Sequence, residues 1–243
     1  MAHLTNSQVP IDHHDISHMA DMAYSGQIHT LAVPIESQWD AKQLSEAFNQ
    51  AYREKFGNVL EGIAAVIVNL RTVVVDTGFN AAMAAKRQRE LLRSPSEGLA
   101  LMGVDSRTVQ DVVITHMHYD HVGTFDEFPQ ARFHLQDAEM QYATGRHMCN
   151  GFMNHAYEVE EVIGMVRLVY KDRVTFHRGE ETLAPGISLH HIGGHTDGLQ
   201  AVRVKTARGW VVLASDASHY YEHMGNKRFF SIAFNVGAMR SEE

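Results

Sequence analysis

The chain has little cysteine, no basic cluster and no long apolar run, and each absence excludes something. Cys149 is the only cysteine, so no disulfide can form within the chain and one marker of secretion is missing. The net charge is −8 and no block of lysine and arginine stands out, which disfavours a nucleic-acid partner. The longest aliphatic stretch, Ile63 to Val68, is far too short to span a bilayer, and the N-terminus has no signal-peptide pattern. We therefore expect a soluble cytoplasmic protein with neither a nucleic-acid nor a membrane partner.

The composition is otherwise typical of a folded protein, except that one residue type, histidine, is unusually frequent. A chain of 243 residues that is 44% hydrophobic and 21% charged is long enough and apolar enough for one large domain. Its unusual feature is histidine, of which there are 17. Most histidines are exposed or packed in a core, so the informative question is whether some stand at the spacing of metal ligands.

The first 60 residues differ in sequence pattern from the rest of the chain. A polar, acidic stretch contains His13, His14 and His18 and predicts an exposed arm. A helical spacing of apolar residues follows from Trp39 to Phe56, and Gly57 should stop that helix. We therefore divide the chain into residues 1–60, part arm and part helix, and a main domain over residues 61–243.

The main domain alternates between β-branched runs and helical patterns. Strands are expected at 63–68 and 72–75, which read as a hairpin of buried strands, and at 111–115, 132–135, 173–177, 187–191, 201–205 and 210–214. Helices are expected at 81–92, 96–102, 137–144 and 157–170. Strands and helices interspersed in this way predict an α/β sandwich with sheets inside and helices outside.

Four candidate metal ligands follow directly after one of these strands: His116, His118, Asp120 and His121. Side chains alternate along an extended segment, so the first two point to the same side, and the next turn can bring the other two beside them. Burying so much polar surface without partners would cost several kcal/mol. A metal ion removes that cost, and these ligands suit zinc, iron, manganese or cobalt. The alternative is a polar loop that happens to be rich in histidine.

Two later segments add ligands at strand ends. Gly193-Gly-His195-Thr196 places a histidine after a strand that ends near residue 192, and Ala214-Ser-Asp216 places a carboxylate after the strand from Trp210. Each segment alone is a weak signal, but the three segments in this order are a strong one.

The order HxHxDH, GHT and SD resembles the metallo-β-lactamase superfamily, as does Asp76-Thr-Gly78 at the end of an early strand. The resemblance covers roughly residues 63–235 and implies an αββα sandwich of two mixed sheets with helices outside. It also implies two divalent metal ions, with Zn²⁺ the first candidate and iron, manganese or cobalt the alternatives. In that arrangement the first ion is held by His116, His118 and His195, the second by Asp120 and His121, and Asp216 bridges the two. Asp76 and Thr196 would support the ligands from behind.

Within the superfamily the chain looks most like the N-acyl homoserine lactonases. The similar stretches are Val73 to Phe79, Val113 to Gly123, Phe133 to Gln136, Gly193 to Thr196 and Ala214 to Ser218. The resemblance implies that a metal-bound hydroxide opens a lactone ring and so destroys a quorum-sensing signal. A small lactone or ester is the expected substrate, and a homodimer is a further expectation. Phe152 and Met153 could line an acyl-chain pocket, or they could be ordinary core residues.

The sequence departs from that family at two points. The family often has a tyrosine three residues after the bridging aspartate, where this chain has His219, so Tyr220 and Tyr221 become the candidates for that role, alongside Asp120 as a catalytic group. The family also carries a later histidine in a Gly-His pair, whereas only His219 and His223 follow Asp216 here. Either the chain is short or divergent at its C-terminus, or fewer protein ligands hold the second metal.

Two other functions stay open. The same fold and metal site could act on a thioester, another ester or a β-lactam, because fold does not determine substrate. The chain could also be a degenerate homologue that binds metal without turnover.

Overall fold

The computed structural model describes residues 18–36, 38–206, 209–226 and 233–241. Its core is a pair of sheets. The first sheet has the strand order β2-β1-β3-β4-β5-β6, and the second has the order β10-β9-β8-β7. The bounds of the first six strands are β1 His18–Tyr24, β2 Leu31–Ile35, β3 Ala65–Val75, β4 Asp111–Val113, β5 Arg132–Gln136 and β6 Val174–His177. Those of the second sheet are β7 Glu180–Ala184, β8 Ile187–His191, β9 Gln200–Thr206 and β10 Gly209–Leu213.

The two sheets differ in strand direction. In the first, β3 to β6 run parallel while β1 pairs antiparallel with both β2 and β3, so the sheet is mixed. In the second, all described pairings are antiparallel. Parallel neighbours bring the carboxyl ends of their strands to one edge, and this edge of the first sheet carries the loops that follow β3 and β4.

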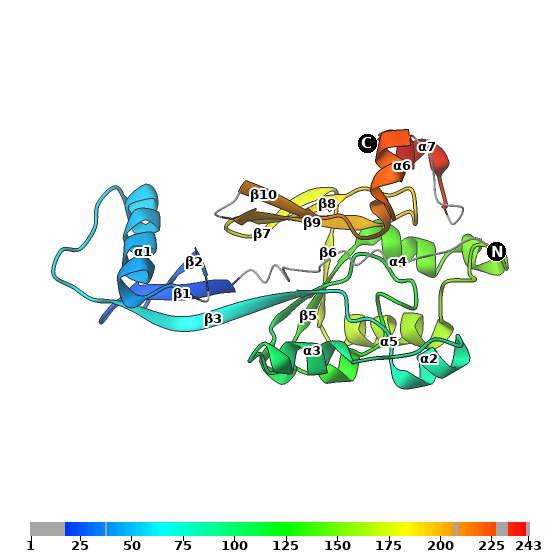
Figure 1. Cartoon of the computed structure of the whole chain (residues 1–243), viewed down its shortest axis with the longest axis horizontal. Helices are drawn as coiled ribbons and strands as arrows, with labels where there is room; N and C mark the ends of the chain where they lie inside the picture. The colour runs from blue at the N-terminus through cyan, green and yellow to red at the C-terminus, as the bar shows by residue number, and fades with distance from the viewer. Residues whose placement is uncertain (1–17, 37, 207–208, 227–232, 242–243) are drawn as a thin grey trace, which may run out of the picture.

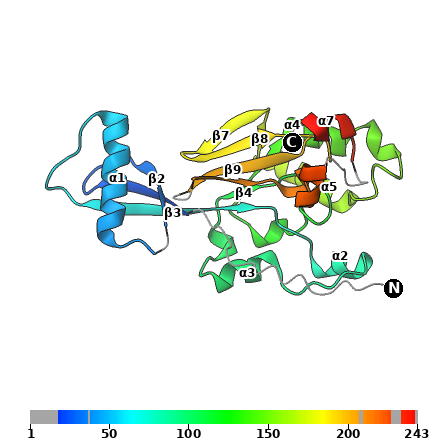
Figure 2. The same ribbon diagram turned by 45° about the horizontal axis from the view of Figure 1, so that its top comes forward.

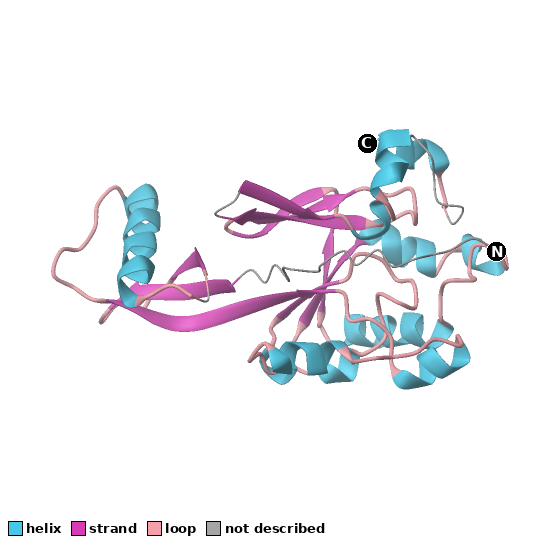
Figure 3. Ribbon diagram, in the orientation of Figure 1, coloured by secondary structure: helices cyan, strands magenta, loops and turns pink. Residues whose placement is uncertain are grey.

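Helices cover the outer side of the first sheet. Figures 1 and 3 show α2 (Ala81–Lys86), α3 (Pro95–Leu101) and α5 (Val159–Tyr170) on the side away from the second sheet. Strand β4 shows how the layers are built, because Val112 is buried in the cluster toward these helices while Val113 is buried between the sheets with Leu189 and Val202. The predicted α/β sandwich is therefore confirmed. The remaining helices are α4 (Asp137–Ala143), α6 (Tyr221–Asn226) and α7 (Val236–Ser241).

Strands β1 and β2 and helix α1 form a lobe with a small core of its own. Helix α1 (Ala41–Phe56) lies over β1 and β2, and Phe48 packs with Tyr24 and Met22 beneath it. Figures 1 and 2 show this lobe projecting from the sandwich at the far end of β3. The predicted helix is confirmed, with Gly57 as its left-handed cap at φ 82°. The predicted arm is wrong at His18, which begins strand β1, while His13 and His14 lie outside the described residues.

Two other local predictions are corrected, and one strand was missed. The expected hairpin is one continuous strand, β3, because β1 pairs along it from residue 65 to residue 72 and keeps the intervening residues extended. The expected helix over 81–92 ends at Lys86, where the backbone turns through Gln88 at φ 53°. Strand β7 was not predicted, since its sequence Glu-Glu-Thr-Leu-Ala has little β-branched character.

None of the helices in the described ranges combines the length and the apolar character that crossing a bilayer requires.

Candidate metal centre

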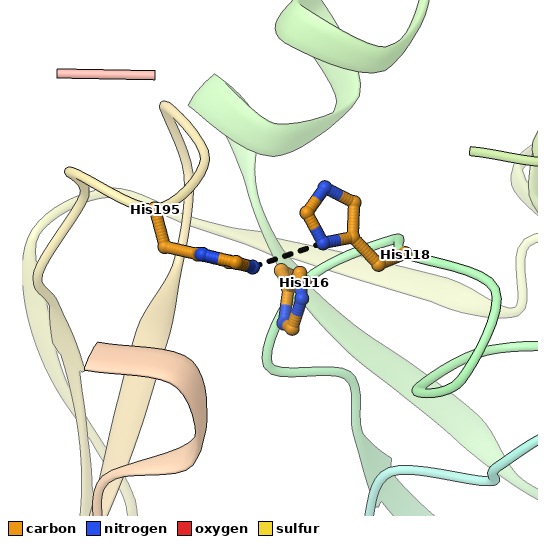
Figure 4. Close-up of side chains that lie close together, drawn as sticks. All are labelled: His116, His118 and His195. Carbon is orange, nitrogen blue, oxygen red and sulfur yellow. Dashed lines mark hydrogen bonds between the residues drawn. The ribbon is translucent and has the colours of Figure 1, made fainter. Parts of the chain in front are cut away.

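Three buried histidines from two loops lie at the centre of the site. His116 and His118 lie in the loop after β4, and His195 lies in the loop between β8 and β9. Figure 4 shows the three rings pointing toward one another. The Nε2 atom of His195 is 3.0 Å from Nδ1 of His118, and one ring nitrogen from each residue lies within 4.8 Å of the others. This is the convergence that a metal ion with nitrogen ligands needs.

Asp216 stands between this group and His121. Its Oδ2 atom is 3.2 Å from Nε2 of His195 and 3.9 Å from Nε2 of His116, and its Oδ1 atom is 3.4 Å from Nε2 of His121. Each carboxylate oxygen therefore faces a different part of the cluster. His116, His121 and Asp216 form a second group whose ligand atoms lie within 4.8 Å of one another.

Asp120 is the outermost of the predicted ligands. Its side chain is 44% exposed, and its Oδ2 atom is 4.0 Å from Nε2 of His121. It is not a member of the compact three-residue groups found in the described part of the chain. The structure thus brings five of the predicted ligands close together and places Asp120 at the rim, beside His121.

Asp76 holds the ligand loop from behind. It follows β3 and adopts φ 61°, a left-handed conformation that costs a non-glycine residue on the order of 1 kcal/mol or more. Its Oδ1 atom accepts the backbone N–H of Thr115 at 2.7 Å, and its Oδ2 atom accepts the Thr115 hydroxyl at 2.8 Å. The same Oδ2 is 2.7 Å from Nδ1 of His121, which leaves Nε2 of that ring turned toward Asp216.

Burial and the neighbouring carboxylates shift the pKa values of the histidines in opposite directions. Burial, together with the neighbouring imidazoles, lowers the pKa of His116 and of His118 well below the usual value, so both rings are neutral and can act as ligands. Burial alone would lower the pKa of His121, but hydrogen bonds to Asp216 and Asp76 outweigh it and raise the pKa to about 10. Burial opposes ionisation of Asp216 too, yet hydrogen bonds from His121 and His219 hold its pKa far below the usual range.

A buried acceptor without a protein partner supports the same conclusion. Nε2 of His116 is fully buried and has no hydrogen-bond partner among the described residues. Its Nδ1 lies 3.2 Å from the hydroxyl of Thr115, whose proton is donated to Asp76, so Nδ1 carries the ring proton and Nε2 keeps its lone pair. A divalent cation would use that lone pair, and the imidazole and carboxylate donors around it fit such an ion.

Comparison with known proteins agrees with this geometry. The family model described as "Metallo-beta-lactamase superfamily" matches residues 63–233. The chain belongs to the metallo-beta-lactamase superfamily. It is 28% identical over 130 residues to an N-acyl homoserine lactonase of a Bacillus species, covering 53% of this chain and 46% of that protein. It is 29% identical over 133 residues to N-acyl homoserine lactonase AiiB of Agrobacterium fabrum, covering 53% of this chain and 48% of that protein. The chain spans about half the length of the curated relatives it matches.

A solved structure shows the same fold. The crystal structure of a quorum-quenching N-acyl homoserine lactone lactonase superposes with a TM-score of 0.58 at 17% identity, covering 93% of this chain and 82% of that one. The fold of this metallo-beta-lactamase superfamily member is therefore as the sequence motifs predicted.

Glu139 on α4, which accepts four hydrogen bonds behind the candidate ligands, was not predicted from the sequence. Its side chain is completely buried, and its Oε1 atom accepts the backbone N–H of Met117 at 2.8 Å and the hydroxyl of Tyr157 at 2.8 Å. Its Oε2 atom accepts the hydroxyl of Thr196 at 2.6 Å and the backbone N–H of Gly198 at 3.1 Å. Glu139 therefore ties the loop of His116 and His118 to the loop of His195.

A signal for Glu139 was present in the sequence. Tyr142 and Ala143, three and four residues further along α4, are buried together with it. A carboxylate at the head of such an apolar helical stripe must be buried and hydrogen bonded. Thr196, predicted to support the ligands, lies in this network and donates its hydroxyl to Glu139.

The two tyrosines predicted for catalysis are exposed to solvent. Tyr220 is 60% exposed and Tyr221 is 88% exposed, and the ring of Tyr220 packs edge-on against His223. The side chain that reaches the cluster from this segment is His219, whose Nε2 is 3.1 Å from Oδ2 of Asp216.

An apolar pocket opens beside the ligands. His118 and His195 form one part of its wall, and Phe152, Met153 and Phe234 form another. Phe152 and Met153 were expected to be either pocket residues or core residues, and both line this pocket.

Proposed function

We propose that this protein is a metal-dependent hydrolase that opens the ring of a lactone with an apolar acyl chain, and that it holds two divalent ions, with Zn²⁺ the first candidate. The observation that carries the proposal is the convergence of His116, His118 and His195 on one point, with Asp216 placed between them and His121. The similarity to two N-acyl homoserine lactonases supports the lactone as substrate.

The chain's own residues would divide the work as follows. His116, His118, His195 and Asp216 would hold one ion, and His121, Asp120 and Asp216 the other. Bound divalent ions supply a water nucleophile of lowered pKa and polarise the substrate carbonyl. Asp120, exposed at the rim, would also take the proton that the attacking water loses and pass it to the departing ring oxygen, as a positioned carboxylate does in general acid–base catalysis.

The pocket next to the ligands suits the acyl chain. Phe152, Met153 and Phe234 offer apolar surface directly beside His118 and His195, so a carbonyl at the cluster would leave its alkyl tail against these side chains. A lactone with a longer acyl chain should therefore bind more tightly than a short one, by up to about 0.8 kcal/mol for each methylene that is buried.

The test is hydrolysis of a substrate panel by protein loaded with Zn²⁺, with acid release followed by a pH indicator. The panel contains N-acyl homoserine lactones of several chain lengths, a thioester and a β-lactam. We expect release of acid from the lactones, and loss of that activity in His118→Ala and Asp120→Asn. Preference for the thioester or the β-lactam would replace the lactone assignment, and full turnover by either variant would refute the metal mechanism.

A matched pair of variants tests the pocket. Phe152→Ala should raise KM for a long-chain lactone roughly tenfold, because about 1.4 kcal/mol of apolar contact is lost. Tyr170→Ala removes another exposed aromatic ring, on α5 and outside the pocket, and should leave KM unchanged. Equal KM values in the two variants would show that the acyl chain binds elsewhere.

A further inference from the structure

The segment after Asp216 brings an additional imidazole to the metal centre. Nε2 of His219 lies 3.1 Å from Oδ2 of Asp216, and its side chain is largely buried at 18% exposure. Ligand atoms of His195, Asp216 and His219 lie within 4.8 Å of one another, so His219 belongs to a compact group of its own with two of the ligands described above. Its ring centroid is 5.3 Å from that of His195.

Three separations between neighbouring donor atoms match those of donors around one ion. Two donors that each stand about 2.1 Å from a metal ion are about 3.0 to 3.4 Å apart when they occupy adjacent corners of an octahedron or a tetrahedron. The distance from Oδ2 of Asp216 is 3.1 Å to His219 and 3.2 Å to His195, and the distance from His195 to His118 is 3.0 Å. All three separations fall in that range.

Another close pair of histidines shows what a purely structural arrangement looks like here. Nδ1 of His134 is 2.9 Å from Nε2 of His177, but each ring bonds a carboxylate through its other nitrogen. The four groups therefore form a chain that runs from Asp111 to Glu181, with no common centre. Around Asp216, by contrast, several imidazole nitrogens approach the same oxygen.

From this convergence we propose that His219 is a protein ligand of the metal centre, coordinating through Nε2 on the side shared by His195 and Asp216. The proposal rests on the metal centre put forward above and is independent of the substrate. It gives the segment after β10 two ligands three residues apart, where the sequence pointed to Tyr220 and Tyr221.

Substitution by glutamine separates coordination from simple hydrogen bonding. The amide nitrogen of glutamine stands close to the place of a histidine Nε2, so His219→Gln keeps a donor for Asp216 but is a poor ligand. The matched control is His223→Gln, which changes the next histidine along the chain, with its ring centroid 6.3 Å from that of His219.

The experiment measures Co²⁺ binding by competition with a chelator, together with the absorption spectrum and the proton NMR spectrum of the Co²⁺ protein. We expect His219→Gln to bind Co²⁺ at least about 10- to 100-fold more weakly, the usual cost of losing even a supporting group. We also expect the variant to lose one of the paramagnetically shifted, exchangeable imidazole N–H resonances, while His223→Gln keeps the affinity and the number of resonances of the unchanged protein.

Each outcome decides the question. Unchanged affinity and an unchanged number of resonances in His219→Gln would overturn the role of His219 and leave the metal centre intact. A failure of the unchanged protein to bind Co²⁺ at all would overturn the metal centre and His219 with it. If His219→Gln does not fold, the resonances of the unchanged protein, assigned by selective ¹⁵N-histidine labelling, show directly whether the ring of His219 is shifted.

Discussion

The buried carboxylate of Glu139 gives a prediction whose size follows from the structure. The hydroxyl of Tyr157 donates to Oε1 of Glu139 at 2.8 Å, and Tyr157 is only 7% exposed. Burial raises the pKa of Glu139, but its four partners among the described residues are all donors and favour the charged, acceptor-only form. A hydrogen bond to a charged group contributes about 1.5 to 3 kcal/mol, and water cannot easily replace it at a buried position.

Tyr157→Phe should therefore lower the free energy of unfolding by about 1.5 to 3 kcal/mol. In a protein of this size, 1 kcal/mol corresponds to roughly 2 to 4 °C, so Tm should fall by about 3 to 12 °C. The assay is urea unfolding of protein treated with a chelator, since metal bound only to the folded state would otherwise add its own stabilisation.

A neighbouring tyrosine provides the control. The hydroxyl of Tyr142 is also in a buried residue, but within the described part of the chain it donates only to the sulfur of Met153, at 3.5 Å, and a thioether is a weak acceptor. Tyr142→Phe should cost less than about 1 kcal/mol. If the two variants lose the same stability to within about 0.5 kcal/mol, the carboxylate does not depend on Tyr157 and the reasoning about the network is refuted.

Two further predictions concern the same region. A Cβ atom on Gly198 would lie 2.0 Å from the backbone nitrogen of Glu139, so Gly198→Ala should lower the free energy of unfolding by at least about 1 to 3 kcal/mol in urea unfolding. Gly151→Ala is the control and should change little, because a Cβ there meets nothing within 4 Å. Equal effects of the two substitutions would mean that the segments of Gly198 and Glu139 can move apart without cost. Folding raises the pKa of His121 from 6.5 to about 10, so its protonation stabilises the metal-free protein fully below pH 6.5, and this contribution is lost as the pH rises toward 10. Tm of the metal-free protein should therefore fall over that pH interval. Calorimetric titration with Zn²⁺ near pH 8, in buffers of different ionisation enthalpy, should show proton release. A Tm that does not change with pH, together with no released proton, would contradict the assigned charge of His121.

Local patterns were sufficient wherever the structure is set by neighbours in the chain. The helix over residues 41–56 follows from apolar spacing, from the capping box at Asp40 and from the left-handed Gly57. The candidate ligands His116, His118, His195 and Asp216 could be found because each follows a strand, and strand ends are visible as β-branched runs that stop at polar residues.

Other features depend on residues far apart in the chain, which no local pattern encodes. Strand β3 is continuous because β1 pairs along it, and no residue between 63 and 75 carries that information. Helix α2 ends at Lys86, and the next residue, Arg87, donates a hydrogen bond to Glu158, which lies 71 positions further along the chain. Glu139 joins two ligand loops that the sequence shows only as separate motifs.

Periodicity and strand ends are local properties, so the sandwich fold and the kinds of side chain at the candidate metal centre could be predicted from the sequence. Which of those side chains meet depends on how distant loops pack together. The tertiary structure turned Tyr220 and Tyr221 toward solvent and brought His219 to Asp216, since the direction of a side chain after a strand depends on how the following turn packs against the other loops.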